Sequence, residues 1–191
     1  MKRWCVAALT ACVLAAPVWA QGGERQVGER VGASAGRVVD GYLEIEWDDL
    51  IPSDWMPEKL FEELFSDVER LDDADPRAEA LMRTVREAWD AAPLVEDFRG
   101  RKVRLPGFVV PLDGDARVIR EFLLVPYFGA CIHVPPPPAN QLVLVRPDKP
   151  IPAGWNMQPV WVSGVMEVER RSSELGTSGY RMTGERVVEY E

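Results

Sequence analysis

Apolar and polar positions follow two different periods along the chain. Leu43, Ile45 and Trp47 alternate with two glutamates, which indicates a short strand. Between residues 57 and 91 the period becomes helical, with prolines 57 and 76 suited to first helical turns. We therefore predict two amphipathic helices in this segment. Their apolar stripes consist of Leu60, Phe61, Leu64, Phe65, Val68 and Leu71, and of Ala78, Leu81, Met82, Val85, Ala88 and Trp89.

From about residue 100 the helical period disappears and runs typical of strands follow one another. Pro106-Gly107 interrupts the first run, which indicates a bulge or sharp bend. The pattern predicts an α+β fold: a small OB-like antiparallel β-barrel (100–191) behind a two-helix N-terminal segment, in a single domain of residues 38–191. A small open sandwich would give much the same pattern. The five predicted strands are Lys102–Leu112, Ile119–Val125, Gln141–Arg146, Val160–Glu169 and Tyr180–Tyr190.

The first twenty residues have the three-part pattern of a secretory signal peptide. A basic start precedes an apolar run of about thirteen residues, and small residues stand at positions −3 and −1 before a cleavage site after Ala20. The run is too short for a membrane span, so we expect no transmembrane segment after cleavage. Leu9-Thr10-Ala11-Cys12 offers lipidation at Cys12 as the alternative. The apolar stretch before Cys12 is very short, which favours cleavage and a periplasmic or secreted protein.

Composition narrows the classes of partner. Residues 21–37 are rich in glycine, serine and charge without a hydrophobic period, so they predict a flexible leader. The 191-residue chain has a net charge of −9, and this charge argues against nucleic acid and anionic membranes as partners. Two of the three cysteines belong to the predicted signal peptide. The mature chain then has one cysteine, Cys131, and cannot form an internal disulfide.

The most distinctive segment contains this cysteine and the one histidine of the chain, His133. In an extended segment, residues two positions apart point to the same side, so thiol and imidazole could reach a common ion. Four prolines then favour a stiff polyproline II rod, and Gly129 permits a positive φ just before the pair. The signature loop is defined here as residues 127–141; it contains Tyr127, Gly129, Cys131, His133, Pro135, Pro136, Pro137, Pro138, Asn140 and Gln141.

This block resembles an uncharacterised domain family of exported bacterial proteins with the signature Tyr-Phe-Gly-Ala-Cys-Ile-His-Val-Pro-Pro-Pro-Pro-x-Asn-Gln. The match extends to residues 105–112, 121–126, 159–164 and 179–180, and so covers roughly residues 40–190. The resemblance implies a periplasmic or lipoprotein setting. It also implies that some relatives lie beside transport systems linked to metal uptake, but it supplies no established activity.

Three interpretations of Cys131 and His133 remain open. As soft and borderline ligands they suit zinc or copper, although a closed zinc site needs four protein ligands. As a thiol enzyme or redox dyad they need an orienting residue, for which Asn140 is a candidate, and no second cysteine is present to resolve an oxidised thiol. As core residues of a structural or ligand-binding OB-like module they need no chemistry.

Asn140 and Gln141 either orient the imidazole or begin the next strand. The aromatic residues Trp47, Trp55, Trp89, Trp155, Trp161, Tyr127 and Tyr180 favour a core, with a ligand face as the alternative. We predict an exported, non-enzymatic accessory or binding protein that handles zinc or copper through Cys131-x-His133. Its expected partner is a transporter or another periplasmic protein.

Overall fold

In the computed structural model the described residues are 25–32, 35–56, 76–131 and 136–191. The predicted signal peptide, the first predicted helix, His133 and Pro135 lie outside these ranges. Eight strands in this part of the chain form one sheet in the order β1-β2-β3-β7-β8-β5-β4-β6. Their bounds are β1 Val38–Val39, β2 Tyr42–Glu44, β3 Arg101–Gly114, β4 Val118–Val125, β5 Val143–Pro147, β6 Ile151–Pro152, β7 Pro159–Ser173 and β8 Gly176–Glu189.

The predicted fold class is wrong. The sheet is mixed rather than antiparallel, because β2 pairs in parallel with β3 and β5 with β8. Among the described residues there is one α-helix, α2 (Pro76–Asp90), so the fold is largely β and not an OB-like barrel behind two helices. A period-two pattern shows which residues share a face, but it does not show whether neighbouring strands run parallel. The strands β1 and β6 are too short to leave a pattern, whereas β2 overlaps the short strand predicted from Leu43, Ile45 and Trp47.

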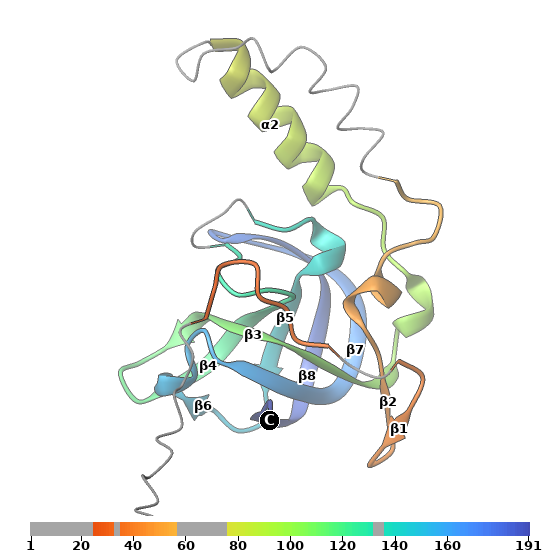
Figure 1. The fold of residues 1–191 in the computed structure, drawn as a ribbon, viewed down its shortest axis with the longest axis vertical. Helices are drawn as coiled ribbons and strands as arrows, with labels where there is room; N and C mark the ends of the chain where they lie inside the picture. Colours follow the sequence, from red (N-terminus) through yellow and green to blue (C-terminus); the bar gives the residue numbers. More distant parts are fainter. Residues whose placement is uncertain (1–24, 33–34, 57–75, 132–135) are drawn as a thin grey trace, which may run out of the picture.

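Strand β3 organises the sheet because it pairs with two partners in succession. Residues 101–108 pair with β7, and residues 108–114 pair with β4, so the sheet curls strongly (Figure 1). The change of partner follows the Pro106-Gly107 step where the sequence predicted a bend. A Cβ atom at Gly107 would lie 2.8 Å from the carbonyl oxygen of Val125, so only glycine fits this close approach of β4.

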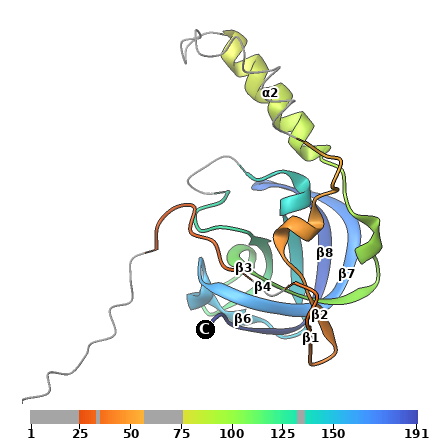
Figure 2. The same cartoon turned by 45° about the vertical axis from the view of Figure 1, so that its right-hand side comes forward.

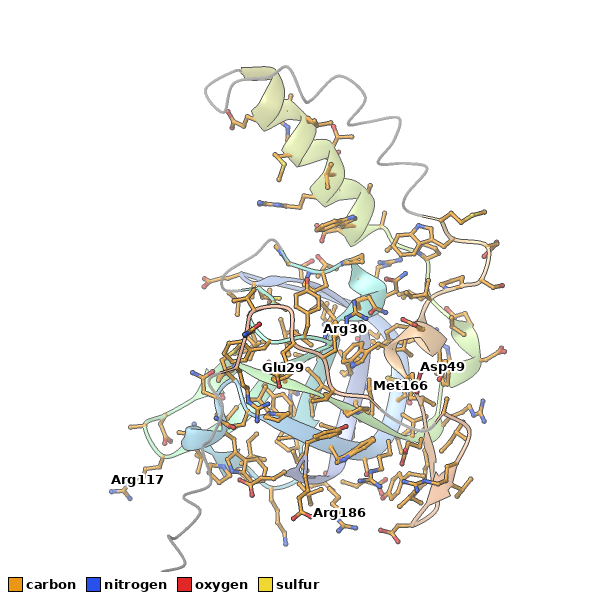
Figure 3. The ribbon with its side chains drawn as sticks, in the orientation of Figure 1. Glu29, Arg30, Asp49, Arg117, Met166 and Arg186 are labelled. Atoms are coloured by element: carbon orange, nitrogen blue, oxygen red, sulfur yellow. The ribbon has the colours of Figure 1, made fainter. Side chains whose placement is uncertain are left out.

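Successive residues of the central strands are buried on opposite faces. In β4, Phe122 and Leu124 belong to the main core inside the curled sheet, which also contains Met166 (Figure 3). Leu123 and Val125 belong to a second cluster on the outer face, together with Phe108, Val110, Ala130, Leu142 and Leu144. Burial on both faces explains why the sequences of β3 and β4 read as nearly continuous apolar runs. We call the second group the outer cluster.

Short 3-10 helices connect the strands. They are η1 (Trp47–Leu50), η3 (Glu96–Phe98), η4 (Ala139–Gln141) and η5 (Ala153–Trp155). Three of them (η1, η3 and η4) lie at the end of the sheet nearest α2, and η5 lies beside β6 at the other end (Figure 1). Helix α2 stands away from the sheet and meets it through its C-terminal end (Figures 1 and 2). Arg170 of β7 fastens that end, since its guanidinium donates to the carbonyl oxygens of Asp90 and Ala92 at 2.5 Å. A cation at this position also interacts favourably with the helix dipole.

Candidate functional site

Two buried amides hold the C-terminal part of the signature loop in place. Gln141 donates through Nε2 to the carbonyl oxygen of Trp47 at 2.8 Å, and Asn140 donates through Nδ2 to that of Pro93 at 3.1 Å. Both residues lie in η4, ahead of β5. The amides therefore connect the loop to η1 and to the segment that follows α2. Their bonds go to backbone carbonyl groups, and His133 lies outside the described part of the chain.

The N-terminal part of the loop is covered by residues 25–32, a segment for which the sequence predicts a flexible leader. Gly28 donates its N–H to the carbonyl of Phe128 at 2.9 Å, and Phe128 donates to the carbonyl of Glu29 at 2.8 Å. The Arg30 guanidinium lies 5.8 Å from the centre of the Tyr127 ring, which is cation–π geometry. Figure 3 shows Glu29 and Arg30 on this covering segment. The segment thus forms one wall of the loop's surroundings.

Cys131 has the left-handed φ of 66° and is half-buried against the outer cluster. Burial raises the pKa of its thiol to about 12. The thiol is therefore protonated at neutral pH, whereas nucleophilic attack and metal binding both require the thiolate. Burial likewise raises the pKa of the neighbouring Tyr127. This environment suits a thiol that packs as a small apolar group.

The surroundings of Cys131 do not complete a metal site within the described chain. No group of three or more histidine, cysteine, aspartate or glutamate residues lies close enough to hold a metal ion in those ranges. The neighbours of Cys131 are instead the apolar and aromatic side chains of the outer cluster. The described residues therefore do not fit a zinc or copper centre by themselves, since such a centre needs several nitrogen, sulfur or oxygen ligands.

A groove runs beside the loop and is built from residues far apart in the sequence. Two adjoining hollows of about 290 and 360 Å³ share Arg30, Asp48 and Pro126 in their walls. We call them together the signature groove. Its aromatic and proline residues are Trp47, Trp55, Trp89, Tyr127, Pro106, Pro126, Pro137 and Pro138. Polyproline residues of the signature thus form part of a wall that the aromatic residues continue.

This apolar groove also contains one positively and one negatively charged side chain. Arg30 and Asp48 are exposed, and each takes part in the lining of both hollows. The aromatic residues and the prolines were expected from the sequence, but Arg30 and Asp48 were not. No motif marks either residue, because Arg30 belongs to the segment that looked like a leader and Asp48 to a short acidic turn. Their role follows only from the fold that brings both segments to the loop.

The fold is a largely β domain built on one mixed sheet, with an apolar recess beside the signature loop. The family described as "Protein of unknown function (DUF3299)" matches residues 47–189, and the chain belongs to this family. The membership expected from the resemblance is confirmed.

A crystal structure of a DUF3299 family protein from Pseudomonas aeruginosa PAO1 is similar to this chain. It is 39% identical and has a TM-score of 0.60; the match covers 78% of this chain and 97% of that one. The comparison with curated proteins finds no match. Among the helices of the described residues, none has the length and apolar character that crossing a membrane requires.

Proposed function

We propose that this chain is an exported, non-enzymatic accessory protein that binds an extended, proline-containing segment of another protein in the signature groove. The observation that carries the proposal is the composition of the groove, where four aromatic residues and four prolines line adjoining hollows. Aromatic grooves bind polyproline II segments because proline rings pack against flat ring faces. Such a segment is already extended, so it loses little conformational entropy on binding.

The groove is held in shape before any partner arrives. Gln141 ties the loop to Trp47, and Asn140 ties it to the segment after α2. Tyr127 is braced by the paired backbone of residues 28–30. Walls that need no rearrangement reduce the free-energy cost of binding. Arg30 and Asp48 would set the direction of a bound segment, since each attracts a residue of opposite charge.

The partner class follows from the compartment. Under the predicted cleavage after Ala20, the groove faces the periplasm or the exterior, where a transporter or another periplasmic protein would present the segment. The chain is strongly acidic, which favours a partner with basic residues flanking the proline-containing segment. Nucleic acid is not the proposed partner for the same reason.

Zinc or copper handling through Cys131 and His133 stays a prediction. The raised pKa of the Cys131 thiol opposes it, because a metal must displace a tightly held proton. The same protonation opposes a thiol enzyme. Metal titration of the purified protein and of Cys131→Ser and His133→Ala tests the prediction. Tight binding that both substitutions abolish would establish the metal site, and equal weak binding in all three would end it.

The peptide proposal is tested with a fluorescent decaproline peptide flanked by two lysines. We expect saturable binding to the purified protein, and a loss of affinity of about tenfold or more in Trp55→Ala and Tyr127→Ala, as at central aromatic positions of interfaces. Trp155→Ala is the matched control, because Trp155 is also half-buried but lies in η5 outside the groove. Absence of saturation, or equal affinity in groove and control variants, would refute the proposal.

A further inference from the structure

The outer face of the sheet carries a second hollow, of about 620 Å³, that the signature groove does not use. We infer that this hollow binds a small anionic amphiphile, a molecule with a carboxylate or phosphate head on an apolar chain. We call it the arginine pocket. It receives side chains from β3, β4, β5, β7 and β8, and its basic residues are Arg146, Arg171 and Arg181.

The floor of the pocket is apolar because it continues the outer cluster. Leu112, Leu123 and Leu144 line the hollow and also pack in that cluster. Elsewhere the cluster is covered by the signature loop through Tyr127 and Phe128. Leu123 and Leu144 are buried, whereas Leu112 is half-buried and supplies the exposed hydrocarbon of the floor. An apolar chain placed over Leu112 would remove this hydrocarbon from water, at about 25 cal/mol for each Å² buried.

The arginines of the pocket form ion pairs with two glutamates in its walls. Arg146 donates from Nε to Glu121 at 2.8 Å, and its Nη2 contacts the same oxygen. Arg181 donates from Nε to Glu169 at 2.9 Å, while Arg171 contacts the other oxygen of that carboxylate. These contacts orient the guanidinium groups at little further entropic cost to a ligand.

The charges of the pocket do not cancel. Three arginines face two glutamates, which leaves one positive charge in excess within a chain of net charge −9. The hydrogen bond from Arg181 and the nearby Arg171 lower the pKa of Glu169, so this glutamate keeps its charge at neutral pH. The hydrogen bond of Arg181 uses only Nε, so its two Nη groups have no hydrogen-bond partner among the described residues. These donors suit a planar carboxylate or a phosphate oxygen pair.

The apolar floor and the arginine donors together select the class of ligand. A simple anion would leave the exposed part of Leu112 uncovered, and an apolar molecule would leave the Arg181 donors without an acceptor. The volume lies in the range of sites for small molecules. A ligand with an oxyanion head over Arg181 and Arg171 and a chain of several methylene groups along the leucines satisfies both parts.

Calorimetric titration of the purified protein with octanoate and octyl phosphate tests the inference. We expect saturable binding of at least one of them, with the tighter ligand identifying the headgroup. Acetate should bind at least tenfold more weakly because it lacks the chain, and octyltrimethylammonium should not bind because its head is cationic. Octyltrimethylammonium binding as tightly as octanoate would overturn the inference, as would failure of both anionic amphiphiles to saturate.

Single-charge variants locate the binding. Arg181→Gln and Arg171→Gln should each weaken the tighter amphiphile about tenfold, because a charged hydrogen bond is lost. Arg117→Gln is the matched control: it removes the same charge from the exposed connection between β3 and β4 (Figure 3), and its affinity should equal that of the wild type. Thermal unfolding of the three variants verifies that each is folded. Equal affinity in Arg181→Gln and Arg117→Gln would contradict the assigned site.

Discussion

The two faces of the curled sheet differ in what covers them. The main core lies inside the curl, and Phe122, Leu124 and Met166 are fully buried within it. The outer cluster uses the alternate residues of the same strands and is also buried, but side chains packed against it are half-buried, among them Tyr127 of the signature loop and Leu112. Tyr127 lines the signature groove, and Leu112 lines the arginine pocket. The enclosed face stabilises the fold, and the half-buried cover of the outer face supplies the surfaces proposed for binding.

Truncating one residue on each face of the sheet should give the largest difference in the free energy of unfolding. Phe122→Ala removes a fully buried ring from the main core and should lower the free energy of unfolding by about 3–5 kcal/mol. Leu112→Ala trims a half-buried side chain in the arginine pocket and should cost about 1 kcal/mol or less. Urea denaturation measures both. The same Leu112→Ala protein should bind octanoate several-fold more weakly, and equal destabilisation by the two variants would contradict the distinction between the faces.

Loss of the Gln141 hydrogen bond that attaches the signature loop to η1 should give the next largest loss of stability. Gln141→Ala removes a buried hydrogen bond and the packing of a buried side chain, at a cost of about 1–2 kcal/mol. It should also weaken decaproline binding, because the loop wall of the groove loses its attachment to η1. Gln158→Ala, at an exposed position, is the control for both measurements. A Gln141→Ala protein with wild-type stability and peptide affinity would show that this hydrogen bond does not support the loop.

The anchor of α2 gives a smaller, local effect. Arg170→Gln removes the bonds to the last carbonyl groups of the helix region and should cost about 1 kcal/mol. Hydrogen exchange should accelerate in α2 and stay unchanged in β4, because the helix meets the sheet through this end. Arg120→Gln, which affects an exposed ion pair with Asp115, is the control. Uniform acceleration across the sheet would mean that Arg170 supports the whole fold instead.

The protonation of Cys131 gives the smallest effect at neutral pH. The folded pKa of about 12 lies above the ordinary cysteine value of 9.0, so the protonated thiol is favoured in the folded state. The stabilisation is fully present below pH 9 and is lost as the pH rises from 9 toward 12. Relative to Cys131→Ser, the wild type should therefore lose stability across this interval. The rate of alkylation by iodoacetamide should still rise at pH 10, and a plateau near pH 9 would contradict the burial of the thiol.

The sequence predicted some features of this molecule well and others not at all. Family membership followed from the signature, and the five main strands followed from strand-like runs bounded by turn residues. The parallel pairings of β2–β3 and β5–β8 left no trace, because side-chain alternation is the same in parallel and antiparallel strands. Residues 25–32 lacked a hydrophobic period, and their order comes from backbone bonds to the signature loop. Such bonds depend on the fold and not on local composition.

The site was predictable where it rests on a contiguous motif. Tyr127, Pro137, Pro138 and Gln141 were singled out in the sequence, and all four line the groove. Asp48 was not singled out in the sequence, because its neighbours in space come from distant segments of the chain. The arginine pocket was invisible for the same reason: its three arginines lie on β5, β7 and β8 and share no spacing rule. Clusters assembled by tertiary contacts have no signal in a single sequence.

The central claim is that the signature groove binds an extended proline-containing segment. Two-dimensional NMR of the indole N–H groups tests it most directly, because tryptophans lie both in the groove and outside it. On titration with the lysine-flanked decaproline peptide, we predict saturable shifts for Trp55 and Trp89, which line the groove. The signals of Trp155 and Trp161, outside it, should stay in place. Shifts confined to Trp155 and Trp161, or no shift at all, would contradict the account.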